Sequence, residues 1–222
     1  MNARGFSLVE LLLASALMAA GLALAFGILQ GAMRATASAE RLASHTDQLR
    51  SVQGLLRRHL ADALPQAIDP AAGIDELRLL RLDPERVEFV GLMPGTLARG
   101  GVYVQVFRLE RRSNGLALLF EYRMLTPEGV LPAMRPPELL LEGLAEARFS
   151  ARGFDPDGRP GPWRDRWERL GELPLQVRLE AGFAEPRWRF PTVVVPLRHS
   201  LSGLVGLLPE AMRRDPRGED ET

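Results

Sequence analysis

The hydrophobic pattern of the chain begins with one long apolar run near its N-terminus. The residues from Leu11 to Leu29 include no charged side chain, and about 20 apolar residues in a helix are enough to cross a bilayer. Arg4 precedes the run and the next basic residue is Arg34. This distribution of positive charge predicts a cytoplasmic N-terminus. We therefore expect a transmembrane span over about residues 6–29.

The helical pattern continues beyond this run and becomes amphipathic. Pro65 is the first proline of the chain, so a helix can extend without interruption from residue 6 to residue 64. A stripe of apolar residues along its second half predicts that this half packs against the chain's own folded domain. The stripe consists of Leu42, Leu49, Val52, Leu56, Leu60 and Ala63.

Alternating apolar and polar residues after Pro65 predict β-strands. A polar connector over 69–75 is followed by expected strands at 77–82, 86–92, 101–110, 116–122, 145–154, 175–183 and 188–197, with 139–144 as strand or short helix. Asn114-Gly115 favours a tight hairpin turn. The predicted fold class is α+β, a long helix packed on an antiparallel sheet that forms a head over 65–212. The charged tail at 213–222 is expected to be disordered.

Composition excludes several classes of function. The 222 residues carry no net charge, with 28 basic and 28 acidic side chains, whereas nucleic-acid binders usually show a basic excess. The chain has no cysteine, which excludes disulfides, thiol catalysis and zinc–cysteine sites. His45, His59 and His199 lack the spacing of metal ligands, so we expect them at solvated positions. No metal or cofactor is expected, and no catalytic motif is present, so the chain is predicted not to be an enzyme.

Asp155-Pro156-Asp157-Gly158 resembles a fragment of a calcium-binding loop. It lacks the third oxygen ligand and the distal glutamate of such a loop. Asp-Pro and Asp-Gly are common in turns, so a turn is the favoured interpretation of this segment.

Glu10 is the residue of the N-terminal segment that most needs an explanation, because a carboxylate within an apolar helix costs several kcal/mol unless it is paired or neutralised. Small residues also recur in this helix at intervals of four. Gly27 and Gly31 form a GxxxG pair, a pattern that lets membrane helices approach closely. Glu10, Gly27 and Gly31 are therefore candidate assembly residues.

The N-terminal segment has three competing interpretations. A secretory signal would be cut after Ala39 in Ala37-Ser38-Ala39, but its apolar stretch is shorter than the one present here. A plain membrane anchor explains the length of the run and leaves Glu10 unexplained. Cleavage after Gly5 explains both, because Phe6 then begins the mature chain and its new amine can pair with the Glu10 carboxylate of a neighbouring subunit.

The residues from Arg4 to Leu12, RGFSLVELL, resemble the prepilin cleavage motif of type IV pilins and type II secretion pseudopilins. The family usually has threonine at the position of Ser7. The resemblance implies a leader peptide over 1–5, and cleavage between Gly5 and Phe6 by a prepilin peptidase/methyltransferase. It further implies N-methylation of Phe6 and a role for Glu10 in assembly.

Other segments are similar to the J-type minor pseudopilins of type II secretion systems. The similarity lies in Trp163 and Trp167 ahead of the segment 173–179, in the strand at 187–197, and in the segment 55–62. It implies a subunit of the pseudopilus tip, with I-type and K-type minor pseudopilins as partners. It also implies a single-pass anchor in the bacterial inner membrane and a head in the periplasm. From the sequence, Trp163 and Trp167 fit either a core or a partner contact.

Two other functions stay open at this point. One is a minor pilin of a type IV pilus or DNA-uptake system, which has the same leader. The other is a secreted or anchored enzyme with an unrecognised site.

Overall fold

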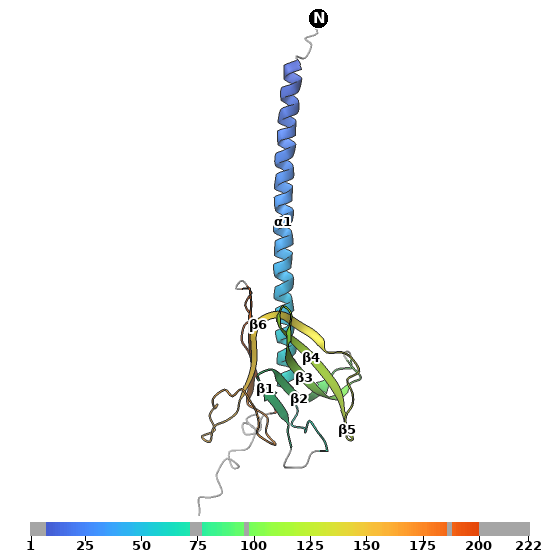
Figure 1. The fold of residues 1–222 in the computed structure, drawn as a ribbon, viewed down its shortest axis with the longest axis vertical. Helices are drawn as coiled ribbons and strands as arrows, with labels where there is room; N and C mark the ends of the chain where they lie inside the picture. The colour runs from blue at the N-terminus through green and yellow to red at the C-terminus, as the bar shows by residue number, and fades with distance from the viewer. Residues whose placement is uncertain (1–7, 72–76, 96–97, 186–187, 200–222) are drawn as a thin grey trace, which may run out of the picture. The chain divides into compact units, whose positions relative to one another are not determined.

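The computed structural model describes residues 8–71, 77–95, 98–185 and 188–199 (Figure 1). The chain divides into two units, residues 1–50 and 51–222. The elements are α1 Leu8–Ala61, β1 Leu80–Asp83, β2 Arg86–Met93, β3 Gly101–Arg112, β4 Gly115–Thr126, β5 Gly129–Val130, β6 Glu138–Arg152, β7 Gln176–Phe183 and β8 Val193–Pro196.

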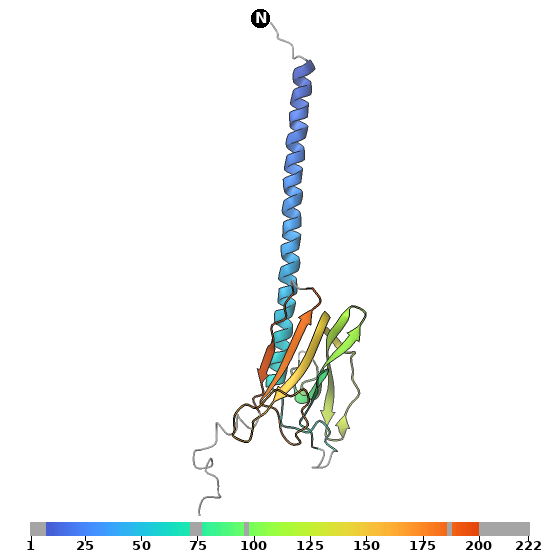
Figure 2. The same cartoon turned by 60° about the vertical axis from the view of Figure 1, so that its left-hand side comes forward.

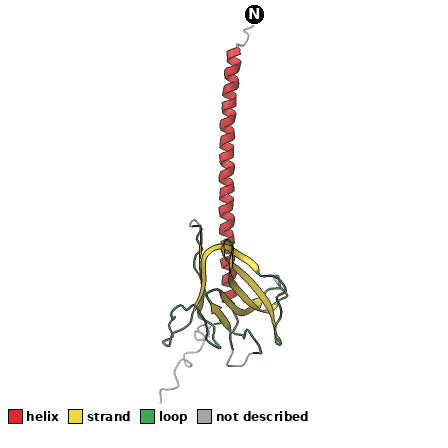
Figure 3. Ribbon diagram, viewed as in Figure 1, coloured by secondary structure: helices red, strands yellow, loops and turns green. Residues whose placement is uncertain are grey.

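Helix α1 is continuous over 54 residues, as the absence of an early proline predicts, and Figure 3 shows it as one unbroken coil. It ends at Ala61, three residues before the predicted end at Leu64. Pro65 disfavours helical geometry for the residue before it, and the Leu64 amide instead donates a hydrogen bond to the Val90 carbonyl of β2 at 2.8 Å. The apolar stripe also begins later than predicted, because Leu42 exposes 56% of its surface.

All strand pairs are antiparallel. The sheet has the order β1-β2-β3-β4-β6-β7-β8, and the short β5 pairs with β4 outside this path. Figure 2 shows the orange and red strands β7 and β8 beside β6. The predicted hairpin joins β3 to β4, with Arg112 opposite Gly115. Gly115 has a positive φ of 121°, and a Cβ atom there would lie 2.5 Å from the Leu144 carbonyl oxygen. Glycine is therefore required at this turn by both conformation and space.

The two faces of the sheet bury different clusters. On one face the last turns of α1 contribute Val52, Leu56 and Leu60, which are 0–5% exposed. The ring of His59 lies 5.1 Å from that of Phe120 on β4. The opposite face has a second cluster, to which the chain after α1 contributes Ile68. Its other buried members are Val90, Val104, Val106 and Leu125.

The sheet curls so that distant strands meet. The Phe149 amide of β6 donates to the Pro84 carbonyl in the β1–β2 turn at 2.9 Å, although three strands separate β1 from β6 in the sheet. The segment between β6 and β7 closes the same side, because the Trp167 amide donates to the Leu82 carbonyl at 3.0 Å. Gly153 lies under Trp167, whose ring would be 2.6 Å from a Cβ at that position.

Several strand boundaries differ from the predictions. β1 begins at Leu80 rather than Leu77, and β8 covers only Val193–Pro196 of the predicted 188–197. The ambiguous segment 139–144 is strand and joins the predicted 145–154 strand into β6. Shifts of register against β4 occur between Leu116 and Leu119, which blur the alternation from which strands are predicted. Residues 72–76 of the connector and the tail at 213–222 lie outside the described residues.

Candidate assembly sites

The first half of α1 is apolar on all sides. Leu8–Arg34 has a mean hydropathy of 2.3 over its most apolar part, and none of that part is buried. At 1.5 Å per residue, these 27 residues extend about 40 Å, more than the ~30 Å hydrocarbon core of a bilayer. A helix that is hydrophobic all round requires lipid or other helices around it. This segment is therefore suited to span a membrane and to pack against neighbouring helices there.

Glu10 lies in the first turn of the described helix and its side chain is exposed. It is the one acidic residue in the sequence from Leu8 to Arg34. A carboxylate near a helix N-terminus is favoured by the helix dipole, which lowers part of the cost of placing it in an apolar segment. Gly5 and Phe6, the predicted cleavage site, lie outside the described residues.

Gly27 and Gly31 leave open space beside the helix. A Cβ atom added at either position would meet no described atom within 4 Å. Neither glycine is therefore required by a close contact among the described residues. A pair of this kind gives a neighbouring helix a shallow surface on which the two backbones can approach.

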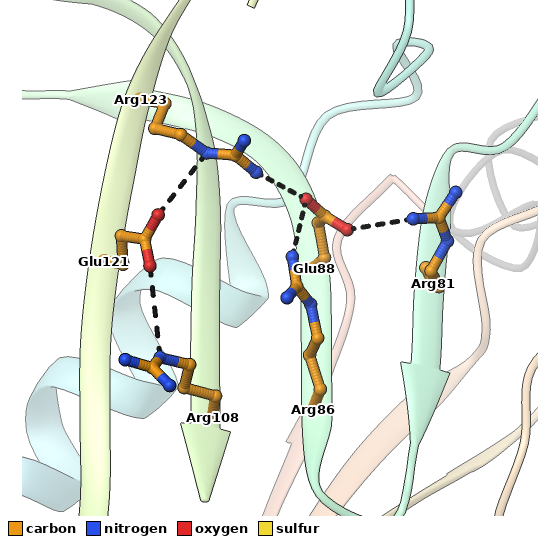
Figure 4. A network of polar contacts seen from close by, with 6 residues as sticks. All are labelled: Arg81, Arg86, Glu88, Arg108, Glu121 and Arg123. Atoms are coloured by element: carbon orange, nitrogen blue, oxygen red, sulfur yellow. Dashed lines mark hydrogen bonds and ion pairs between the residues drawn. The ribbon is translucent and has the colours of Figure 1, made fainter. Parts of the chain in front are cut away.

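An arginine–glutamate network covers the face of the sheet that lies opposite α1. In Figure 4 the Glu88 carboxylate of β2 lies among Arg81, Arg86 and Arg123. The nitrogen–oxygen distances are 3.4, 3.1 and 2.9 Å, and the Glu88 side chain is only 3% exposed. Three guanidinium groups around one carboxylate compensate for the cost of burying its charge.

The network continues onto β3 and β4. Glu121 lies 3.5 Å from Arg123 and 4.0 Å from Arg108, and Arg108 also contacts Glu110 at 2.8 Å. This network was not predicted from the sequence. The sequence does contain a sign of it, because charged residues stand two apart in β3 (Arg108 and Glu110) and in β4 (Glu121 and Arg123). Residues two apart on a strand share a face.

The two tryptophans of the predicted motif have different positions. Trp167 is a core residue, 3% exposed, and its indole N–H donates to the Glu172 carbonyl at 3.1 Å. Trp163 is half-buried on the outer face of β6 and β7. The guanidinium carbons of Arg152 and Arg178 lie 4.6 and 4.4 Å from its ring centroid, so the ring is held by cation–π contacts.

The sequence predicted a solvated position for His59, but this residue is buried, with 7% of its surface exposed. His45 is half-buried, and His199 is exposed as predicted. In the part of the chain that the structure describes, no three metal-binding side chains come together. The Asp155 carboxylate accepts hydrogen bonds from the amides of Asp157 and Arg159, which confirms the turn.

Comparison with known proteins agrees with these features. The family model of the prokaryotic N-terminal methylation motif matches residues 1–26. Type II secretion system protein J of Xanthomonas campestris pv. campestris is 34% identical over 209 residues, which cover 91% of this chain and 96% of the relative. The second similarity extends through the apolar helix and the sheet alike.

Proposed function

Because the chain belongs to the type II secretion system protein J family, we propose that it forms part of the pseudopilus tip complex. There it would initiate assembly of the pseudopilus that supports protein export across the outer membrane. The observation that carries this proposal is the 34% identity to type II secretion system protein J across 91% of the chain. This similarity extends well beyond the methylation motif at residues 1–26. As a member of this family the chain is a structural minor pseudopilin and not an enzyme.

The apolar helix and the methylation motif fit a component anchored in the inner membrane. For its topology, we propose one pass, with the N-terminus in the cytoplasm before cleavage and the head over 65–212 in the periplasm. The support is Arg4 ahead of the span, which favours a cytoplasmic start. The proposed domain order is a leader over 1–5, the long helix from 6, the head and a short tail from 213.

For processing, we propose cleavage between Gly5 and Phe6 and methylation of the new Phe6 amine by the prepilin peptidase/methyltransferase. The family match at residues 1–26 supports this proposal. The Glu10 carboxylate would then pair with the amine of a neighbouring subunit, since a charge in the membrane requires a partner. Gly27 and Gly31 would form the surface on which a neighbouring helix packs.

Intact-mass analysis of the chain purified from its membrane tests the processing step. We expect the loss of residues 1–5 and the gain of one methyl group on Phe6. Gly5→Val should remain uncleaved yet membrane-inserted, because the peptidase must approach the backbone at a residue without a side chain. A wild-type chain cut after Ala39, or normal cleavage of the Gly5→Val variant, would contradict the proposal.

Membership of the family implies association with other pseudopilins, and we propose the I-type and K-type minor pseudopilins as the direct partners. A soluble fragment beginning near Thr36 should form a stoichiometric complex with similarly truncated heads of these two proteins in size-exclusion chromatography. A stable interface of this kind buries on the order of 1,600 Å² in total. A fragment that stays monomeric with both heads at tens of micromolar would leave recognition to the membrane helices alone.

A further inference from the structure

A groove of about 480 Å³ lies beside β3 and β4, on the face of the sheet that also carries Phe107 and Phe120. Tyr103 and Met124, which are opposite each other in the register, form part of its floor together with Tyr122. Its volume is within the range of ~300–1,000 Å³ that is typical of ligand sites. The walls come from the segments after β2 and β5, with Gly95, Ala98, Arg99, Leu131, Pro132, Met134 and Arg135.

The floor of the groove is an extension of the aromatic core. Ring centroids are 4.7 Å apart from Phe107 to Phe120, 5.8 Å from Phe120 to Tyr122, and 5.8 Å from Tyr122 to Tyr103. The Tyr103 hydroxyl donates a hydrogen bond to the Arg99 carbonyl at 2.9 Å. This bond ties the segment that carries Arg99 to the floor. A surface that is already ordered loses little conformational entropy when it binds a partner.

The groove is open because α1 ends beside it. His59 covers Gln105, which is opposite Tyr122 in the register. The helix ends two residues later, and Ala63 pairs with Gly91 of β2. Tyr103 and Met124 are the next pair on the same face of these two strands, and they line the groove.

Charge on the groove has one sign. Its lining includes Arg99 and Arg135 and no acidic residue, and no salt bridge links either arginine to a carboxylate among the described residues. The hollow near Trp167 differs, because three arginines and three acidic residues line it together: Arg78, Arg81, Arg166, Asp83, Glu85 and Glu168. In a chain with no net charge, two arginines without acidic neighbours favour an anionic partner.

The apolar lip indicates the second property of the partner. Leu131 exposes 45% and Met134 exposes 79% of its surface. Exposed methionine beside an apolar floor is typical of surfaces that accept a bulky hydrophobic side chain, because its flexible thioether adapts to different shapes. A guanidinium group suits carboxylates in particular, since its planar donors match the two carboxylate oxygens.

We propose that this groove binds a peptide segment of another protein in which a bulky apolar side chain stands between two carboxylates. The apolar side chain packs on Tyr103, Tyr122 and Met124, and the carboxylates bind Arg99 and Arg135. The inference comes from the groove alone and does not depend on the processing or partners proposed above.

The test uses the full-length chain in detergent micelles and a fluorescein-labelled peptide with the core Glu-Leu-Phe-Glu. Fluorescence anisotropy measures its binding beside two matched peptides, Gln-Leu-Phe-Gln and Glu-Ser-Ser-Glu, and beside empty micelles. We expect saturable binding of the first peptide. The glutamine peptide should bind at least ~10-fold more weakly because it loses the charge-assisted contacts. The serine peptide should bind at least ~10-fold more weakly because it has no apolar side chain to bury on the floor.

The variant R99Q/R135Q should reduce binding of the acidic peptide by at least ~10-fold without changing thermal unfolding, because both side chains lie at the rim. Arg111→Gln is the matched control, an exposed arginine of β3 outside the groove, and should bind as the parent does. Equal binding of the glutamine peptide, equal binding by R99Q/R135Q, or no binding at millimolar peptide would overturn the proposal. So would self-association that R99Q/R135Q abolishes, because the occupant would then be a second copy of this chain.

Discussion

The Nδ1 atom of His59 lies 2.7 Å from the Oε1 atom of Gln105 and joins the last turn of α1 to β3. The amide oxygen can only accept, so the imidazole must carry its hydrogen on Nδ1. The Gln105 amide nitrogen donates in turn to the Leu92 carbonyl at 3.3 Å. A buried polar pair with satisfied donors fixes one register between helix and sheet more specifically than apolar contacts do.

The burial of His59 makes the stability of the head dependent on pH. Burial lowers the pKa of His59 from 6.5, against the opposing effect of the Gln105 hydrogen bond; Arg58 also lowers this pKa and Asp62 raises it. The unfolded chain therefore binds the proton first as pH falls. We expect the free energy of unfolding to decrease from about pH 6.5 down to the folded pKa, and to lose no more from this group below it.

Urea unfolding followed by tryptophan fluorescence between pH 5 and 8 measures this effect, since all three tryptophans lie in residues 51–222. His59→Gln removes the titrating group and should flatten this part of the pH profile. His199→Gln, at an exposed position, is the matched control and should keep the slope. The assignment to His59 fails if His59→Gln retains the parent's dependence on pH.

Glu88→Gln should destabilise the head by about 2 kcal/mol, the scale of lost hydrogen bonds between charged groups. The substitution keeps the shape of the side chain but leaves Arg81, Arg86 and Arg123 around a neutral amide, and breaking a buried ion pair is costly. Glu180→Gln is the control, because the Glu180 carboxylate is more exposed than that of Glu88 while lying 2.9 Å from Arg148 and 3.3 Å from Arg178. Its ion pairs should contribute less than about 1 kcal/mol. Similar losses of stability in the two variants would show that burial does not increase the contribution of the Glu88 ion pairs to the free energy of unfolding.

Glu10→Leu should be cleaved and inserted normally, because leucine is favoured in lipid. It should nevertheless support secretion poorly, since the proposed pairing with a neighbour's amine is lost. The measurement is export of a secreted protein by cells whose only copy is the variant, alongside intact mass to establish processing. Full secretion with normal processing would remove the proposed role of this carboxylate.

Gly27→Ile and Gly31→Ile test helix packing in the membrane. The open space beside both glycines predicts that the head folds and the chain inserts as before. The added side chains should keep a neighbouring helix from approaching closely and reduce the yield of crosslinked assembly at least ~2-fold. Ala25→Ile is the control, because residue 25 lies on the face opposite Gly27. A loss that is equal at Ala25 would point to bulk alone.

The sequence was most informative where one physical requirement dominates. The apolar run and the absence of proline before Pro65 predict a long helix, and Asn114-Gly115 predicts the β3–β4 hairpin. These features depend on local geometry and on transfer into lipid. The prepilin-type motif follows from residues 4–12, and the family match over residues 1–26 confirms it.

Features that depend on distant residues could not be predicted. His59 reads as a polar residue on the helix, and its burial requires Gln105 and Phe120 to lie opposite. Leu42 belongs to the apolar stripe by spacing, yet it is exposed. The length of β8 depends on pairing with β7, which covers only four residues. Tertiary contacts, rather than local propensity, decide each of these outcomes.

The end of α1 and the segment after β8 meet at Arg198. Arg198 donates from its amide to the Ala61 carbonyl at 3.0 Å, and its side chain contacts Asp62 at 2.9 Å across 136 residues of sequence. Most strands of the sheet pair with a neighbour in sequence and can form as soon as both are made. The Arg198 contact instead closes a loop that contains the whole sheet, and closing a long loop is entropically costly and slow. We expect the hairpins to form early during synthesis, and folding to finish only after the C-terminal strand has been released.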